Sequence, residues 1–137
     1  MISVLSTTSK YILQPSLLDM HRQSLEWLSA SALWKRELAF FQKLLDTHAP
    51  RFTTEEDKKK IDHFQNLIIY YNGEVVDSIR KKLRNHEGTL ANSLQKENEA
   101  DTRYYSEHKD LMDEAATFDK TFTELKHGLF SFVEEVL

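Results

Sequence analysis

Histidine is the residue type in this chain with the widest chemical use. The 137 residues include six histidines and no cysteine, which excludes disulfides, thiolate metal sites and a cysteine nucleophile. Imidazole binds transition metals and exchanges protons near neutral pH. Any such chemistry therefore depends on which groups the fold places beside the six rings. They are His21, His48, His63, His86, His108 and His127.

Two short motifs have spacings that occur in metal-binding helical bundles. Glu124 and His127 form a Glu-x-x-His pair, the unit from which di-iron carboxylate sites are built. His108 and Asp113 have the His-x4-Asp spacing found in haemerythrin-like iron proteins. Each motif occurs once, whereas a di-iron site needs two Glu-x-x-His units and two further glutamates. A ferritin-like or haemerythrin-like protein that binds a transition metal is therefore the alternative interpretation, not the first.

A second group of polar residues is brought together by topology. In an up-down-up bundle, the beginning of the first helix lies at the same end as the turn between the second and third helices. On the third helix, Glu97, Asp101 and His108 share one face at i, i+4 and i+11. The competing interpretation is a solvated helix end. The metal-ligand candidates at this end of the bundle are His21, His86, Glu97, Asp101 and His108.

The elements that carry these residues are predicted to be helices, because the few helix breakers fall where helices would stop. Ser16, directly after Pro15, has the position of an N-cap. Pro50 ends the first apolar run, and a basic stretch followed by Gly88 indicates a C-terminus. The predicted organisation is a single domain over 1–137, with an arm over 1–15 and helices over 16–49, 53–86 and 89–135.

These helices predict an all-α fold, an antiparallel up-down bundle of three long helices. Two alternatives stay open. The third helix could break near 98–101, which would give a four-helix bundle. The hydrophobic stripe also keeps its phase across 83–94, so the second helix could continue through Gly88. Within the second helix, Gly73 marks either a crossing side chain or a bend, because glycine costs a helix about 1 kcal/mol against alanine.

A coiled-coil-like seam runs along the first helix. Its positions alternate in spacing between four and three residues, as the a and d positions of a heptad do. The aromatic residues of the chain are too many to face one seam, and those left over predict an interface with a second copy, as a dimer, or with another helical protein. The seam runs Met20, Ser24, Trp27, Ser31, Trp34, Leu38, Phe41, Leu45 and His48. The interface candidates are Trp27, Trp34, Phe40, Tyr70 and Tyr71.

The totals of the chain exclude several classes of function. A net charge of −4 argues against a nucleic-acid surface. Only three glycines occur, and no phosphate-binding loop or Ser/His/Asp arrangement accompanies them. No apolar run approaches the roughly 20 residues that span a bilayer, and residues 1–10 lack the features of a signal peptide. We therefore expect a cytoplasmic protein that binds no membrane.

Two segments resemble a known group of proteins. They are the run Glu37 to Phe41 and the run Asp62 to Asn66, with Trp27 upstream and the basic segment Arg80 to His86 downstream. Over 20–90 the chain resembles small bacterial helical proteins that have no assigned function. This resemblance implies a helical hairpin and a bacterial cytoplasmic setting, and it implies no activity. We therefore expect a non-enzymatic structural or protein–protein interaction role without a cofactor.

Overall fold

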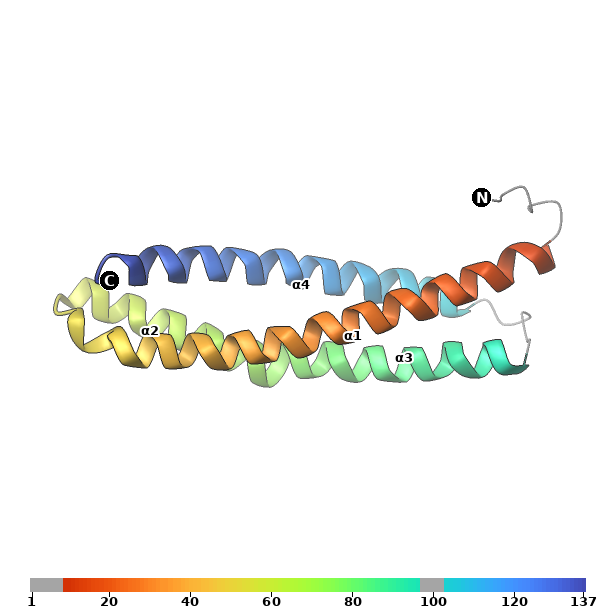
Figure 1. The fold of residues 1–137 in the computed structure, drawn as a ribbon, viewed down its shortest axis with the longest axis horizontal. Helices are drawn as coiled ribbons and strands as arrows, with labels where there is room; N and C mark the ends of the chain where they lie inside the picture. The colour runs from red at the N-terminus through yellow and green to blue at the C-terminus, as the bar shows by residue number, and fades with distance from the viewer. Residues whose placement is uncertain (1–8, 97–102) are drawn as a thin grey trace. The chain divides into compact units, whose positions relative to one another are not determined.

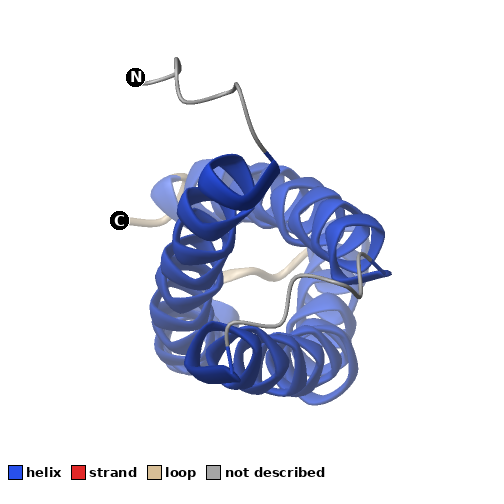
Figure 2. Cartoon of the chain, turned by 90° about the vertical axis from the view of Figure 1, so that its right-hand side faces the viewer, coloured by secondary structure: helices blue, strands red, loops and turns tan. Residues whose placement is uncertain are grey.

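The protein is helical throughout the part of the chain that the structure describes. The computed structural model describes the backbone of residues 9–96 and 103–137 and the side chains of 17–92 and 104–137. Figures 1 and 2 show helices and connecting segments in these ranges, and no strand. The all-α class predicted from the sequence is therefore confirmed. The elements are α1 (Ser9–His48), a 3-10 turn η2 (Ala49–Arg51), α2 (Glu55–Tyr70), a π-helix η3 (Tyr71–Val76), α3 (Asp77–Lys96) and α4 (Arg103–Glu134).

The chain divides into two compact units, each built from segments of several helices. Unit 1 comprises Met1–Ala30 and Ile79–Ala115, and unit 2 comprises Ser31–Ser78 and Ala116–Leu137. Both α1 and α4 contribute a segment to each unit, because their bounds extend past the points of division.

Unit 2 has an aromatic core. Trp34 is 3% exposed, and its indole meets the Phe118 ring edge-on with ring centroids 4.9 Å apart. The indole nitrogen Nε1 donates a hydrogen bond to Asp119 at 3.2 Å. Phe41 stacks on Phe122, with centroids 5.9 Å apart. These contacts join α1 to α4 along the seam expected from the sequence.

The connection between α1 and α2 follows ordinary capping rules. Thr54 is the N-cap of α2, and its hydroxyl accepts a hydrogen bond from the backbone N–H of Asp57 at 3.1 Å. Phe52 stacks on Phe132 of α4 at 4.1 Å between centroids, which fixes the turn against the core of unit 2.

Two predicted helix ends are wrong. α3 continues through Gly88 to Lys96, so the stop predicted at 86 and the new start predicted at 89 are replaced by the continuous helix. Leu83, His86 and Leu90 are buried on one stripe across this point. Burial of these side chains outweighs the cost of about 1 kcal/mol for a helical glycine. The break predicted near 98–101 lies outside the described residues.

The beginning of the first helix also differs from the prediction. α1 begins at Ser9 and includes Pro15, so residues 9–15 of the predicted arm are helical and Ser16 is not an N-cap. A proline inside a helix removes one backbone hydrogen bond at a cost of about 3 kcal/mol. That cost does not require the helix to start after the proline.

A π-helical segment shifts the buried stripe between α2 and α3. η3 contains Gly73, and no neighbouring atom lies within 4 Å of the position that a Cβ would take there. A crossing side chain at Gly73 is therefore ruled out. The stripe passes from Ile68 to Val76, which is 0% exposed, because a π turn inserts one extra residue. Lys35 of α1 donates to the Asn72 carbonyl at 3.3 Å.

Replacement of Gly88 by alanine tests the continuous helix. A Cβ at Gly88 would meet nothing within 4 Å, and alanine is the better helix former. Gly88→Ala should raise the free energy of unfolding by about 0.5–1 kcal/mol in urea denaturation. Lys81→Ala, at an exposed position of the same helix, should change stability little. A loss of stability in Gly88→Ala would instead place Gly88 in a left-handed helix cap.

Candidate functional site

Two histidines occupy core positions of unit 1. The neighbouring core consists of Leu17 and Met20 of α1, Leu90 of α3 and Tyr104 of α4. One helical turn from Leu90 lies His86, and one turn from Tyr104 lies His108, each on the buried stripe of its helix. Both histidines are 6% exposed. The unit therefore buries two imidazoles where its helices would otherwise carry apolar side chains.

The two rings form a hydrogen-bonded chain that ends on α1. His86 Nε2 lies 2.9 Å from His108 Nδ1, and His108 Nε2 lies 2.7 Å from the side-chain oxygen Oε1 of Gln23. An amide oxygen only accepts, so His108 Nε2 must carry hydrogen. In a neutral ring, His108 Nδ1 is then an acceptor, and His86 Nε2 donates to it. The chain of donors thus runs from His86 through His108 to Gln23.

One nitrogen of the pair, Nδ1 of His86, is left with a lone pair that no described residue contacts by a hydrogen bond. A neutral His86 that donates from Nε2 has a bare Nδ1. Among the described residues, no hydrogen-bond partner reaches that buried atom. A buried polar atom without a partner costs about 1–3 kcal/mol. His86 Nδ1 is therefore a buried hydrogen-bond acceptor without a partner among the described residues.

Burial keeps both imidazoles neutral at pH 7. The pKa of His86 is lowered from its ordinary value mainly by burial, and the nearby Glu107 carboxylate partly opposes the shift. The pKa of His108 is lowered to about 4, first by burial and then by repulsion from a charge on His86. Each ring therefore acts near neutral pH as one donor and one acceptor.

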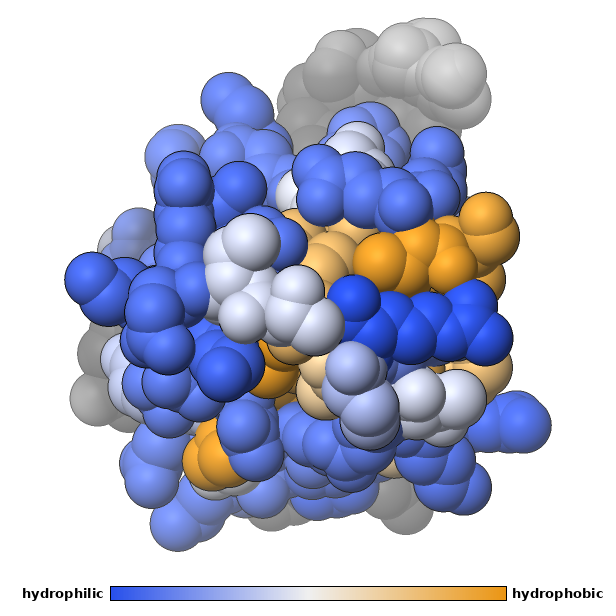
Figure 3. Space-filling view, turned by 90° about the vertical axis from the view of Figure 1, so that its left-hand side faces the viewer, coloured by the Kyte–Doolittle hydropathy of each residue, from blue (hydrophilic) through white to orange (hydrophobic). Residues whose placement is uncertain are grey.

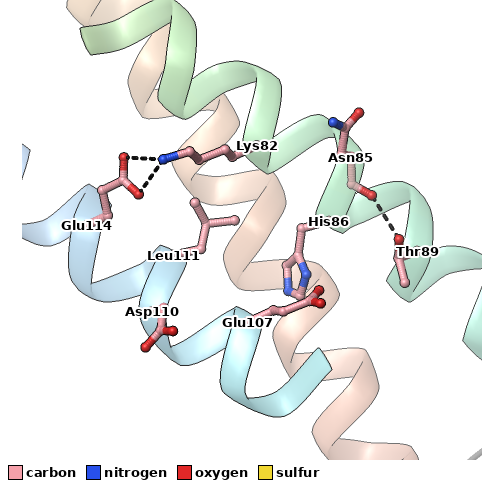
Figure 4. Close-up of a pocket in the computed structure, with 8 residues that line it drawn as sticks. All are labelled: Lys82, Asn85, His86, Thr89, Glu107, Asp110, Leu111 and Glu114. Atoms are coloured by element: carbon pink, nitrogen blue, oxygen red, sulfur yellow. Dashed lines mark hydrogen bonds and ion pairs between the residues drawn. The ribbon is translucent and has the colours of Figure 1, made fainter. Parts of the chain in front are cut away.

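A shallow pocket of about 380 Å³ borders His86 between α3 and α4. Figure 4 shows that its lining residues come from both helices, with the imidazole of His86 beside the carboxylate of Glu107. Three carboxylates and one ammonium line the pocket. The ammonium of Lys82 contacts both carboxylate oxygens of Glu114, at 3.0 and 3.1 Å. The lining residues are Lys82, Asn85, His86, Thr89, Glu107, Asp110, Leu111 and Glu114.

Other polar groups are buried in unit 1. Ser24 is 0% exposed and Tyr104 is 4% exposed, and neither hydroxyl has a hydrogen-bond partner among the described residues. His21 Nδ1 lies 3.1 Å from a carboxylate oxygen of Glu87, at the boundary between α1 and α3. The polar character of this unit therefore extends beyond the histidine pair.

The structure brings together part of the group of metal-ligand candidates. His86 and His108 are in contact, whereas His21 pairs with Glu87. Glu97 and Asp101 lie outside the described residues. Within 17–92 and 104–137, no three His, Cys, Asp or Glu side chains form a group that could hold a metal ion.

The two short motifs are used differently from the metal sites they resemble. Asp113 accepts a hydrogen bond from Lys109 at 3.0 Å, and both Glu124 and His127 are exposed on α4. Sequence reasoning missed Gln23 and Glu107. The available signal was the position of His108 on a hydrophobic stripe, which predicted burial but not the partners.

The interface candidates divide into three groups by exposure. Trp34 belongs to the core of unit 2, Trp27 and Tyr71 are half-buried, and Phe40 and Tyr70 are 57% and 55% exposed. The Tyr71 ring meets Phe118 edge-on at 5.4 Å. Phe40 and Tyr70 are therefore the candidates that present the most aromatic surface to solvent.

Comparisons with known proteins give no relative from which a function can be transferred. No protein-family model, no curated protein and no solved structure matches the chain. A search of the described helices for a segment long and apolar enough to cross a membrane finds none. Function must therefore be argued from the residues themselves.

The histidine pair should make stability depend on pH. Unfolded histidine binds a proton below about pH 6.5, whereas buried His108 stays neutral down to about pH 4. Between these values the unfolded state binds more protons, so the free energy of unfolding should fall as the pH falls, by up to about 3 kcal/mol. Urea denaturation at intervals from pH 7.5 to 4 measures the slope. The variant His63→Gln, at an exposed site, should keep it, and an unchanged stability in the parent chain would contradict the burial of neutral rings.

A double-mutant cycle should show that the two rings act together. His86→Leu leaves His108 Nδ1 without a donor and should cost about 1–3 kcal/mol at pH 7.5. His86→Leu combined with His108→Leu removes both polar partners and fills the site with apolar atoms. The double variant should therefore be more stable than the sum of the single variants predicts, by about 0.5–3 kcal/mol. Additive losses would show that the 2.9 Å contact contributes nothing.

Proposed function

We propose that this chain is a non-enzymatic interaction protein, an antiparallel three-helix bundle that self-associates through one face of unit 2. The proposal places it in the cytoplasm and gives it neither nucleic acid nor membrane as a partner. One observation carries the proposal: Leu33 and Phe40 on α1 are 55% and 57% exposed, and Phe130 of α4, which contacts the neighbour of Phe40, is 39% exposed. We call these three residues the α1/α4 patch.

Ring contacts connect the aromatic members of the patch. Phe40 and Phe41 have centroids 6.3 Å apart, and Phe41 meets Phe130 edge-on at 5.5 Å. Phe41 is 1% exposed, so a core residue supports the exposed rings from below. Supported aromatic side chains lose little conformational entropy on binding, which makes them effective interface anchors.

The spacing of the patch suits contact with another helix. Leu33 and Phe40 are seven residues apart on α1, the repeat of a helix–helix seam. In unit 1 the same helix exposes Leu18 and Leu25, 48% and 45% exposed and also seven residues apart. α1 thus carries an exposed apolar series in addition to the buried seam.

Charge favours a second copy as the partner. Glu37 and Lys126 form an ion pair across α1 and α4 at 3.1 Å, and both are only partly exposed. An isologous dimer brings the same surface of each copy face to face. Beside the apolar residues this surface has one acid, Glu37, and two bases, Lys126 and the exposed Arg36, which lies one helical turn from both Leu33 and Phe40. Charges of both signs let the surface match itself under such symmetry, whereas a surface of one charge sign would repel its copy.

Apolar surface is not restricted to this patch. On α2, Ile69 is 59% exposed beside Tyr70. Figure 3 shows, on the face that it draws, hydrophobic residues in orange among mainly hydrophilic ones. Ile69 has an exposed fraction close to that of Phe40 but lies on a different helix. It therefore provides a matched control for the α1/α4 patch.

Sedimentation equilibrium of the full chain tests self-association. The parent chain should sediment as a dimer, and Phe40→Ser should weaken association by about 30-fold, equivalent to about 2 kcal/mol for a central aromatic anchor. The control Ile69→Ser should leave the dimer intact. Circular dichroism establishes that each variant is folded. A monomeric parent chain at high micromolar concentration, or equal effects of the two substitutions, would contradict the proposal.

A further inference from the structure

The pocket beside His86 has the chemistry of a site for an organic ammonium ion. We propose that unit 1 binds a small alkylammonium compound in this pocket, with the ammonium group donating hydrogen bonds to His86 Nδ1 and to the carboxylate of Glu107. This inference is independent of self-association, because it uses residues of unit 1 only.

The first support is the acceptor on His86. The side chain is 6% exposed, its Nε2 is occupied by His108, and its Nδ1 has no partner among the described residues. An apolar ligand would leave this atom unsatisfied, and so would an anion. A ligand with an N–H donor would satisfy it and would remove the cost of the buried lone pair.

The second support is the charge of the lining. Glu107, Asp110 and Glu114 contribute three carboxylates, and the one ammonium of the lining, Lys82, contacts Glu114. The excess negative charge favours a cation over a neutral donor. Hydrogen bonds between an ammonium group and a carboxylate are also stronger than those between neutral groups.

The third support is the size and apolar part of the pocket. A volume of about 380 Å³ is far more than the roughly 30 Å³ that one water molecule occupies, and it lies at the lower end of pockets for small molecules. Leu111 and the methyl group of Thr89 provide apolar surface in the lining. A short alkyl chain attached to the ammonium group has a place to pack.

The site is expected to bind only some kinds of cation. Because no group of three metal-ligating side chains is present among the described residues, a coordinated metal ion has too few ligands there. A quaternary ammonium ion has charge but no N–H to donate. A primary ammonium ion has both the charge that favours Glu107 and the N–H donors that His86 Nδ1 accepts.

Nuclear magnetic resonance titration of the full chain at pH 7.5 tests the site. Three probes separate the contributions: n-butylammonium chloride has charge and N–H donors, tetramethylammonium chloride has charge without a donor, and n-butanol has the alkyl chain and one O–H donor without charge. Long-range 1H–15N spectra of the imidazoles follow His86 directly. We expect butylammonium to shift the Nδ1 resonance of His86 saturably, with at least tenfold weaker effects from the other two probes.

Two matched variants locate the binding. Glu107→Gln removes the carboxylate charge at an exposed position and should weaken butylammonium binding at least tenfold. Glu55→Gln makes the same change of net charge at an exposed site on α2 of unit 2 and should have no effect. The Glu107 variant is informative even if substitution of buried His86 unfolds the chain.

Several results would overturn the inference. Equal binding of butylammonium and tetramethylammonium would reduce the site to a negatively charged surface, and equal binding of butanol would show that the charge of the ligand contributes nothing. Absence of any saturable shift would also reject it. Saturation of both His86 and His108 by one equivalent of zinc chloride, without a response to butylammonium, would replace the ammonium site by a metal site.

Discussion

Burial of one continuous stripe per helix is the constraint on which the rest of this structure depends. Along α3 the stripe passes Ile79, Leu83, His86 and Leu90, all at most 6% exposed. Each buried aliphatic side chain contributes about 1.5–3 kcal/mol, more than the cost of one helical glycine. The packing of the stripe therefore outweighs the local sequence signals for a helix end near Gly88, and the helix continues.

The same constraint explains why the histidine pair must be hydrogen-bonded. A side chain at a stripe position is shielded from water whatever its type, and a shielded imidazole needs hydrogen-bond partners for its nitrogen atoms. His86 and His108 satisfy one nitrogen each by contact with one another, and Gln23 satisfies a third. The fourth nitrogen, Nδ1 of His86, has no hydrogen-bond partner among the described residues. The unsatisfied group thus follows from placing two imidazoles and one amide in a three-helix core.

The periodicity of the sequence predicted much of the fold and only half of the site. Repeats of three and four residues predicted the seam of α1, whose Ser24, Ser31, Trp34 and Leu38 are buried. The burial of His86 was not predicted, because the second helix was expected to end there. Neither the π turn around Gly73 nor the amide of Gln23 could be predicted in this way. A π turn changes the phase by one residue without a unique sequence signal, and Gln23 is an exposed position by pattern whose side chain reaches inward to His108.

The two units use their cores differently, and this difference bears on function. Unit 2 buries rings such as Trp34, Phe41 and Phe122 in direct contact, an arrangement that favours rigidity because aromatic cores pack densely. Unit 1 has polar residues in its buried core, of which the His86 nitrogen and the Ser24 hydroxyl have no partner among the described residues. In unit 2 the unpartnered buried atoms belong to the partly exposed residues Gln42, His48 and Asn72. Such groups lower stability and are retained at a cost. A rigid unit is suited to present a contact surface, and a polar one is suited to bind a ligand that completes its hydrogen bonds. We therefore propose self-association for unit 2 and ligand binding for unit 1. Both proposals follow from the same property, the identity of the side chains that occupy the buried stripes.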